Sequence, residues 1–470
     1  MQAYQMDSCF RRNDGGNRAR ARFICRQEAG VDKAIADLVQ RAGVTGAGGA
    51  GFPTHIKIGS RSEVVIANGA ECEPLTHVDQ ELMIHHAAEV VAGMQAVIQS
   101  TGATRGIFGV KKKYTAAIQS LRQAIGGNDD LSIFELGNFY PSGDEQVLVY
   151  DVLGRVVPEG GIPLNVGVVV QNIETLYNIN AALAGQPVTH KHITVIGEVQ
   201  RPLTVRVPIG ITLREVIDLA GGPTTADPMV LEGGAMMGHV VGSLDERVTK
   251  RTKILLVLPY SHQLSAKRRQ PRSEIELHAI SACDQCYMCT DFCPRHAQGH
   301  AIQPHKLILL LASGIPLTDE QMSGALLCCE CRTCNYACPV HLSPGDIAIS
   351  VKHDLVKAGL KNPYRRQTEV DPYREFRRVP MYRLVNRLGL ARYDVPAPLT
   401  EVTTPFKRVS LALRQHIGVP VTPVVKVGQT VAVGDVIGEI PETSMGARLH
   451  ASLSGQVREI TPDAILIEAN

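Results

Sequence analysis

The chain of 470 residues contains no tryptophan, and only 4% of its residues are aromatic. It therefore has few rings on which the bases of a single-stranded nucleic acid can stack. The formal net charge of +2 gives no strong attraction to nucleic acid or to an anionic surface. The longest apolar runs, 254–258 and 307–312, fall far short of the roughly 20 residues that a membrane helix needs. We expect no nucleic-acid partner and no membrane span.

A secretion signal is also missing from the start of the sequence. The first 30 residues carry six arginines and no apolar segment of the length that a signal peptide needs. Residues 1–28 are polar and are expected to form a disordered tail. We therefore expect a cytoplasmic protein, in a compartment that keeps thiols reduced. The length exceeds what one hydrophobic core can organise, so roughly three or four domains are expected.

Cysteine, in contrast, is abundant, and nine of the twelve cysteines lie between residues 283 and 338. In a reducing compartment such a concentration indicates metal binding rather than disulfides. Two runs share the spacing C-x2-C-x2-C-x3-C-P, which is typical of bacterial ferredoxins with two [4Fe–4S] clusters. In that arrangement three cysteines of a run bind one cluster and the fourth binds the other. The predicted ligands are Cys283, Cys286, Cys289 and Cys338 for one cluster, and Cys328, Cys331, Cys334 and Cys293 for the other.

Zinc is the alternative metal, because four-cysteine zinc sites also use C-x2-C pairs. Zinc sites normally separate two such pairs, whereas consecutive short spacings favour iron–sulfur clusters. Cys329 falls outside the spacing and is predicted to be a free buried thiol, with a role as an alternative ligand as the second interpretation. Between the runs, residues 301–312 are predicted to be helical, and a second short helix is expected to lead into Cys328.

A second pattern is the glycine-rich segment 43–57, with glycines at 46, 48, 49 and 51. Backbone N–H groups in such a loop can approach a phosphate, and Lys57 can supply the opposite charge. The preceding residues 31–41 are predicted to be helical, so the segment is neither a Walker A loop nor a Rossmann fingerprint. From these residues alone, a plain tight turn is an equally open interpretation.

Residues 46–57, GAGGAGFPTHIK, resemble the flavin loop that the FMN-carrying protein of respiratory complex I shares with the RnfC proteins of the Rnf complex. Segments 65–74, 140–145 and 171–175 (VIANGAECEP, YPSGDE and QNIET) resemble the same family in the same order. The resemblance implies an α/β domain that binds FMN and places NADH over it. It implies FMN contacts from Gly46, Gly48, Gly49, Gly51, Lys57, Asn68 and Asn172, and a dinucleotide side formed by Phe52, Glu73 and Glu145. Glu71, Gly143 and Thr175 are the further matches.

Three positions depart from the pattern of that family. Ala47 stands where complex I has an arginine, Ile58 where an aromatic residue is usual, and Ala70 where an aspartate is usual. These changes affect the expected NADH contacts more than the FMN contacts. For each acidic residue, a solvated or helix-capping carboxylate is the alternative interpretation.

The expected fold class is α/β and α+β, multidomain. The expected domains are an FMN/NADH-binding domain at 29–190, a β-grasp SLBB-like domain at 191–260, a two-cluster ferredoxin-like unit at 270–355, an arginine-rich connector at 356–402 and a barrel-sandwich hybrid at 403–470. Strands are predicted at 63–67, 166–170, 193–197, 203–207 and 254–258, and helices at 87–100 and 213–220. Short strands are predicted at 424–427, 429–432, 435–440, 455–460 and 464–467.

The connector and the C-terminal domain each carry a specific expectation. The connector holds eight arginines and is expected to present a solvated face, with a partner-docking surface as the alternative. The segment that starts at Val425 resembles biotin and lipoyl carriers, but the position of their modified lysine falls near Met445 and Gly446. A swinging-arm carrier is therefore rejected.

The order of the domains refines the resemblance. The RnfC proteins carry their barrel-sandwich module ahead of the flavin domain, whereas here that module comes last. Residues 29–470 resemble the propanediol-utilisation cobalamin reductases of bacterial microcompartments. This resemblance implies an NADH-dependent oxidoreductase that passes electrons through FMN and two [4Fe–4S] clusters to cobalamin. The implied partners are a cobalamin adenosyltransferase and the microcompartment shell. The alternatives are an Rnf-type component with membrane partners and a non-enzymatic relay with a degenerate NADH site.

Overall fold

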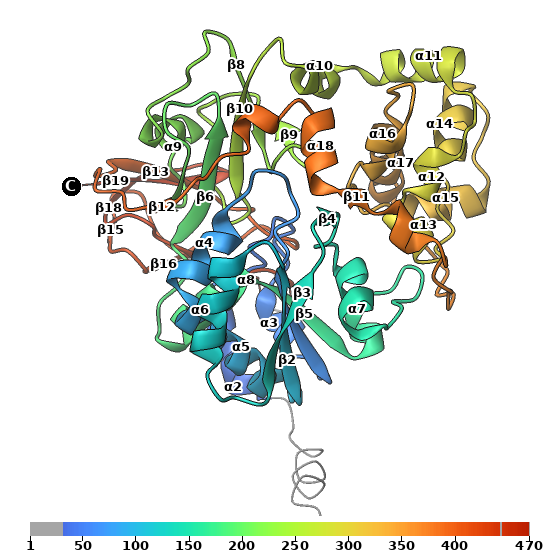
Figure 1. The fold of residues 1–470 in the computed structure, drawn as a ribbon. Helices are drawn as coiled ribbons and strands as arrows, with labels where there is room; N and C mark the ends of the chain where they lie inside the picture. Colours follow the sequence, from blue (N-terminus) through green and yellow to red (C-terminus); the bar gives the residue numbers. More distant parts are fainter. Residues whose placement is uncertain (1–31, 442–443, 470) are drawn as a thin grey trace, which may run out of the picture.

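The computed structural model describes residues 32–441 and 444–469, and Figure 1 shows how they are arranged. The predicted tail at 1–28 lies outside the described residues. Among the helices of the described part, none combines the length and the apolar character that a bilayer span requires. The flavin-type domain lies at the bottom of Figure 1, the cysteine-rich unit at the right and the C-terminal domain at the left.

The N-terminal domain is built on a parallel four-stranded sheet of order β3-β2-β1-β5. Its strands alternate their side chains between two hydrophobic clusters, because successive residues of a strand point to opposite faces. Val65 and Ala67 of β1 pack under most of the helices, whereas Val64 and Ile66 pack under α7. The bounds are β1 Val64–Gly69, β2 Arg105–Lys111, β3 Leu131–Leu136 and β5 Val168–Asn172, with helices α2 Lys33–Arg41, α3 Thr54–Ile58, α4 Val78–His85, α5 Ala87–Thr101, α6 Thr115–Ile125, α7 Glu145–Leu153 and α8 Ile173–Leu183.

The next domain is a six-stranded sheet of order β12-β7-β6-β10-β8-β9. Its helix α9 starts with a capping box, in which Thr212 and Glu215 satisfy each other's backbone N–H groups. The edge strand β12 comes from residue 399 onward, far along the chain, and the sequence did not predict it. The bounds are β6 His190–Gly197, β7 Leu203–Pro208, β8 Pro228–Glu232, β9 His239–Val240, β10 Ile254–Pro259, β12 Leu399–Thr400 and α9 Leu213–Leu219.

The cysteine-rich unit is helical. The predicted helix at 301–312 starts three residues later than expected, because Gln303 is the non-helical N-cap and Pro304 takes the first helical position. The short helix that leads into Cys328 is present as α15. Helices α11 and α17, which the sequence did not predict, pack against α14 around a common core. The bounds are α10 Gln263–Arg269, α11 Arg272–Ala282, α12 Met288–Asp291, α13 Pro294–Ala297, α14 Pro304–Ala312, α15 Asp319–Leu326, α16 Thr333–Ala337 and α17 Pro344–Lys357.

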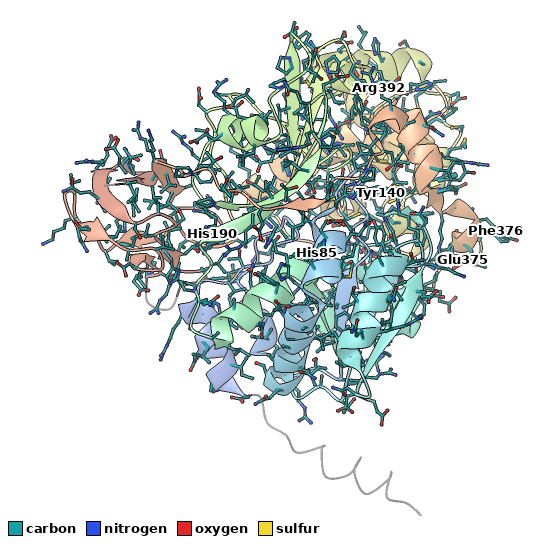
Figure 2. All side chains as sticks on the ribbon, turned by 60° about the vertical axis from the view of Figure 1, so that its left-hand side comes forward. His85, Tyr140, His190, Glu375, Phe376 and Arg392 are labelled. Atoms are coloured by element: carbon teal, nitrogen blue, oxygen red, sulfur yellow. The ribbon has the colours of Figure 1, made fainter. Side chains whose placement is uncertain are left out.

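The arginine-rich connector folds back onto the flavin-type domain. Its strand β11, Val379–Pro380, pairs with β4, Phe139–Tyr140, and is followed by α18, Met381–Arg387. Arg374 is buried and forms an ion pair with Asp151. The expected solvated face is therefore wrong at Arg374, because this arginine is neutralised inside the protein. Figure 2 shows Phe376 of the same stretch at the rim of the molecule, where its side chain is exposed.

The C-terminal domain consists of two small sheets, β13-β19-β18-β15 and β14-β16-β17. The predicted strand at 424–427 is wrong: the strand lies at Thr422–Pro423, and a turn occupies 427–428. The bounds are β13 Arg408–Ala412, β14 Thr422–Pro423, β15 Thr430–Val431, β16 Val436–Glu439, β17 Leu449–His450, β18 Gly455–Ile460 and β19 Ala464–Glu468.

A buried ionic network joins the flavin-type domain to the six-stranded sheet. Glu174 on α8 pairs with Lys191 and His192 on β6, and the three side chains are 1%, 2% and 4% exposed. Burial alone would raise the pKa of Glu174, but the charges of Lys191 and His192 outweigh it and lower this pKa to about 2. The network also reaches the glycine-rich loop, because the Lys191 ammonium donates to the carbonyl of Ala47.

We predict that Glu174→Gln lowers the free energy of unfolding by about 3–5 kcal/mol, because it leaves the Lys191 ammonium buried without its anion. Urea denaturation measures this loss. The stabilisation by the native carboxylate is present above its unfolded pKa of about 4.3 and is lost as the pH falls toward 2. The matched control is Glu63→Gln, since Glu63 pairs with Arg155 at the surface and its loss should cost less than about 1 kcal/mol. Equal effects of the two substitutions would contradict the account.

Candidate functional site

The first predicted ligand set surrounds a single hollow. Cys283, Cys286, Cys289 and Cys338 all line it. Burial, with further contributions from the neighbouring Cys338, Cys283 and Cys286, raises the pKa of the Cys289 thiol to about 12. Cys286 is exposed, so this set reaches the surface. We call these four cysteines the exposed set.

The second predicted set lies deeper. Burial raises the pKa of Cys334 well above its usual range, and the thiols that add most to this effect are Cys328 and Cys293. Cys331 neighbours both Cys293 and Cys334. Three members, Cys293, Cys331 and Cys334, are buried. We call Cys293, Cys328, Cys331 and Cys334 the buried set. Cys289 is a further neighbour of Cys334, so the two sets adjoin.

The same backbone conformation recurs in both cysteine runs. Gln285 and Tyr287 flank the second cysteine of the first run with φ of 56° and 71°. Glu330 and Arg332 flank the second cysteine of the other run with φ of 64° and 54°. Residues with side chains seldom adopt this left-handed conformation, and successive N–H groups in such turns form concavities for anions. The repetition at equivalent positions fits two clusters, whose sulfides would accept hydrogen bonds from these loops.

The chemistry of the donors also fits iron. All ten described cysteines are free thiols. Thiols with raised pKa values stay protonated unless a cation stabilises the thiolate, and metal binding supplies that cation. The left-over Cys329 hydrogen-bonds to Cys331 and neighbours Cys293, so it lies beside the buried set. Its role as a free thiol or as an alternative ligand stays a prediction.

The glycine-rich loop lies beside the carboxyl ends of β1 and β5, where ligands bind in open α/β sheets. A side-chain carbon at Gly48 would lie 3.6 Å from the Asn172 side chain. Gly49 has a φ of 113°, and such a carbon there would meet no described atom within 4 Å, so the backbone borders open space. The Asn172 side chain caps α8 by accepting from the Glu174 N–H at 3.0 Å and donates to Asp79 at 2.8 Å.

The four segments of the resemblance meet at this edge. Lys57 donates to Glu145 and to the carbonyl of Val170, both at 2.9 Å. The Asn68 amide donates to the carbonyl of Gly143 at 2.8 Å. Thr175 accepts the N–H of Ala47, next to Gly46, at 2.9 Å. Gly51 accepts the N–H of Ile417 from the C-terminal domain, and Phe52 is half-buried beside it.

The donors at this edge fit a polar cofactor such as FMN. Thr54, Ser142 and Gln171 each have a buried polar side-chain atom without a hydrogen-bond partner among the described residues. Such atoms are costly unless a ligand or water satisfies them. Each of the three lies within the predicted flavin segments or beside one. The N–H groups of Gly46 and Gly51 donate to the backbone carbonyls of Phe52 and Gly46, which leaves those of Gly48 and Gly49 without a backbone partner among the described residues. These two N–H groups and the Lys57 ammonium suit a phosphate.

Two residues that were predicted to contact cofactors, Glu71 and Glu73, have hydrogen-bond partners within the protein. The Glu71 carboxylate accepts the N–H groups of Asp79 and Gln80 at 2.7 and 3.0 Å, so it caps α4. Burial, with a contribution from Asp79, raises its pKa to about 7. The Glu73 carboxylate accepts the N–H of Met236 from the loop after β8, and burial raises its pKa to about 7. Their contacts to cofactors stay a prediction, and for Glu71 the helix-capping alternative describes its geometry.

The sequence did not predict the residues that join the flavin segments to the cysteines. The Tyr140 hydroxyl donates to the carbonyl of Cys331 at 2.9 Å, in the middle of the molecule as Figure 2 shows. Arg295, two residues after Cys293, forms an ion pair of 2.8 Å with Asp144, and both side chains are largely buried. Tyr140 and Asp144 belong to the 140–145 segment. Cys331 of the buried set, and Arg295 beside Cys293, thus contact the segment that also holds Glu145.

Comparison with known families supports each of these parts. Residues 39–181 match the Nuo51 FMN-binding domain, and residues 192–240 match the SLBB domain. Residues 282–343 match the 4Fe-4S dicluster domain, and residues 396–469 match the RnfC barrel sandwich hybrid domain. The expected fold class is therefore confirmed.

Two curated relatives, both named cobalamin reductase PduS, match nearly the whole chain. The protein of Citrobacter freundii is 42% identical over 437 residues, which are 92% of this chain and 96% of the relative. The protein of Salmonella typhimurium (strain LT2) is 42% identical over 435 residues, again 92% and 96%. The chain belongs to the PduS cobalamin reductase family.

A third relative tests the Rnf alternative. It is a component of the Na(+)-translocating ferredoxin:NAD(+) oxidoreductase complex of Acetobacterium woodii, and it is 36% identical over 271 residues, which are 56% of this chain and 58% of that protein. The PduS match extends over far more of both chains. With FMN-binding and dicluster domains in one chain of this family, the protein is an electron-transfer flavo-iron–sulfur oxidoreductase, as the sequence predicted.

We predict that Cys338→Ser lowers the iron content of anaerobically purified protein from about eight to about four atoms per chain, because the exposed set loses its fourth ligand. Chemical iron analysis and low-temperature EPR after dithionite reduction measure the loss. The matched control is Cys329→Ser, which should keep the full iron content. Full iron in the Cys338 variant, or its loss in the Cys329 variant, would contradict the ligand assignment.

Proposed function

We propose that the protein is an NADH-dependent cobalamin reductase in which the sites of FMN, the buried set and the exposed set lie in series. FMN can take a hydride and release its electrons singly, and iron–sulfur clusters carry single electrons. The observation that carries the proposal is the pair of contacts from Tyr140 to Cys331 and from Asp144 to Arg295. Through them the flavin segment 140–145 touches the buried set, not the exposed one.

The burial of the two sets supports this order. The buried set is shielded by the flavin-type domain on one side and adjoins the exposed set through Cys334 and Cys289. Cys286 of the exposed set reaches the surface. In this order the buried set accepts electrons from the flavin inside the protein, and the exposed set passes them to an acceptor outside it.

The proposed FMN contacts come from the glycine loop, Lys57, Asn68 and Asn172. The Lys57 ammonium is held between Glu145 and the end of β5 at a fixed position, where it can meet the phosphate. Phe52, Glu145 and Glu73 remain the proposed contacts of NADH. The acceptor that we propose is cobalamin, and the partner protein that we propose is an adenosyltransferase. We also propose a cytoplasmic location inside a microcompartment, on the basis of the family resemblance.

One observation favours a second candidate, the electron relay without NADH. Ala47 and Ala70, which replace the arginine and aspartate of complex I, are 2% and 0% exposed and contribute no polar side chain. Glu73 is also occupied by the N–H of Met236. A site without these groups has fewer means of holding a dinucleotide.

Anaerobic titration of the holoprotein with NADH decides between the two. We expect prompt bleaching of the flavin absorbance, then EPR signals of reduced clusters, and then reduction of added cobalamin. Protein whose flavin is reduced by dithionite but not by NADH would reject the reductase and leave the relay.

We predict that Lys57→Met weakens FMN binding about tenfold or more, because a charge-assisted contact to the phosphate is lost. Titration of deflavinated protein with FMN, followed by flavin fluorescence, measures the dissociation constant. Lys112→Met is the control, since Lys112 is exposed beyond the end of β2. Unchanged FMN affinity in the Lys57 variant would remove this residue from the site.

A further inference from the structure

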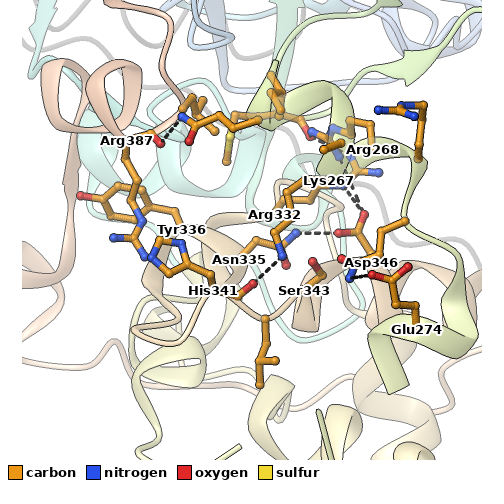
Figure 3. A pocket seen from close by; sticks show the side chains of 18 of the residues that line it. Lys267, Arg268, Glu274, Arg332, Asn335, Tyr336, His341, Ser343, Asp346 and Arg387 are labelled. Carbon is orange, nitrogen blue, oxygen red and sulfur yellow. Dashed lines mark hydrogen bonds and ion pairs between the residues drawn. The ribbon is translucent and has the colours of Figure 1, made fainter. Parts of the chain in front are cut away.

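A cavity of about 580 Å³ lies where the six-stranded domain, the dicluster unit and α18 meet. Figure 3 shows Lys267 and Arg268 of α10 on one side, Arg387 of α18 on the other and Arg332 between them. The volume is typical of sites for small molecules. Neither the FMN segments nor the cysteines themselves contribute to its wall.

The cavity is strongly basic. Lys267, Arg268, Arg269, Arg332 and Arg387 line it, against the carboxylates of Glu274 and Asp346 alone. This excess of positive charge stands out in a chain whose formal net charge is +2. Clefts lined by charge of one sign attract ligands of the other sign. The cavity therefore favours an anion.

Not all of this charge is satisfied within the protein. Asp346 pairs with Arg332 at 2.7 Å and with Arg268 at 3.8 Å. Arg268, with a side chain only 8% exposed, has a buried Nε without a partner among the described residues. Burial, and next the charge of Arg332, lower the pKa of Arg268 to about 10. An anionic ligand would relieve both the missing hydrogen bond and the repulsion.

The remaining wall is partly apolar, and its polar members are Gln263, Gln270, Asn335, His341 and Ser343. Met236, Leu264, Leu342 and Leu388 line it, and Tyr336 adds an aromatic ring beside Arg387. A ligand with a phosphate or similar group and a large organic body matches this combination better than a free inorganic anion does. A cavity of this size can enclose the phosphate-bearing part of such a ligand.

The cavity shares its wall with the exposed set. Leu342 lines both the cavity and the hollow of the four cysteines, and its N–H lies 3.3 Å from the Cys338 sulfur. Arg387 donates to the carbonyl of Cys338 at 2.8 Å. Leu342 thus separates a molecule bound in the cavity from the exposed set. In the proposed order of electron transfer, the exposed set is the one that faces the acceptor.

We propose that this cavity is the docking site of the electron acceptor, whose phosphate-ester group binds among Lys267, Arg268 and Arg387. The identity of that acceptor as cobalamin, which carries a phosphodiester, rests on the proposed function. In each transfer one electron leaves the reduced cluster of the exposed set, which returns to its oxidised state, and Co(III) becomes Co(II). One NADH supplies two such electrons and yields NAD+ and a proton.

The test is equilibrium dialysis of aquacobalamin against the oxidised holoprotein, which involves no electron transfer. Lys267→Gln should weaken binding about tenfold, because it removes one charge-assisted contact, whereas Lys267→Arg should retain it. Glu274→Gln should tighten binding severalfold, because it removes an opposing charge from the cavity. Lys361→Gln, at an exposed position of the connector, is the control and should bind like the parent. Iron and FMN contents verify that each variant is intact.

Opposite changes from Lys267→Gln and Glu274→Gln would support the cavity as the docking site. Absence of binding by the parent protein, or equal affinities in all variants, would overturn it. Cobalamin reduction by NADH is assayed in parallel. If binding depends on these charges but NADH does not drive cobalamin reduction, the proposed reductase is rejected and the docking site stands. If NADH drives reduction but all variants bind with equal affinity, the docking site is rejected and the reductase stands.

Discussion

The contact between the flavin segment 140–145 and the buried set is the constraint on which the rest of the structure depends. A flavin site and iron–sulfur centres can work together only if they are held close and in one orientation. Tyr140 and Asp144 provide that hold through Cys331 and Arg295. The connector also holds the region around segment 140–145. Its strand β11 pairs with β4, and Arg374 and Arg378 both form ion pairs with Asp151 of α7. Arg374 and Arg378 thus act as counter-charges of Asp151, whereas the other arginines of the connector are mostly exposed. The exposed ones are Arg365, Arg366, Arg383, Arg387 and Arg392.

Compensated buried charge is the second theme of the molecule. Glu174 with Lys191, Asp79 with Lys253, and Arg295 with Asp144 each bring opposite charges together between segments far apart in the chain. Removing one partner of such a pair leaves a buried charge, so the pairs fix one arrangement of the domains. The basic cavity departs from this rule, since five cations face only two carboxylates. A departure of this kind is expected where a ligand completes the charge balance.

The sequence predicted what depends on local patterns. Hydrophobic runs predicted β1, β5, β6, β7 and β10 to within a few residues, but not β2, β3, β8 or β9. The cysteine spacing predicted two ligand sets, and the structure places the members of each set near one another. The assignment of each cysteine to a cluster stays a prediction. Features that depend on distant segments were missed: β12 joins its sheet from residue 399, and Tyr140 reaches a carbonyl 191 residues away. The strand expected at 424–427 failed because only Val425 of its three valines is buried. Val424 and Val427 are exposed, and Val427 lies in a turn. The cavity is built from several separate segments, so no local pattern predicts it.

The order of the two cysteine sets is the central claim, and EPR of two variants after anaerobic addition of NADH tests it most directly. Cys286→Ser disrupts the exposed set at a surface position, and Cys293→Ser disrupts the buried set. The account predicts that NADH still reduces the remaining cluster in the Cys286 variant. In the Cys293 variant it should bleach the flavin but leave the remaining cluster oxidised. Rapid reduction of that cluster in the Cys293 variant would contradict the series.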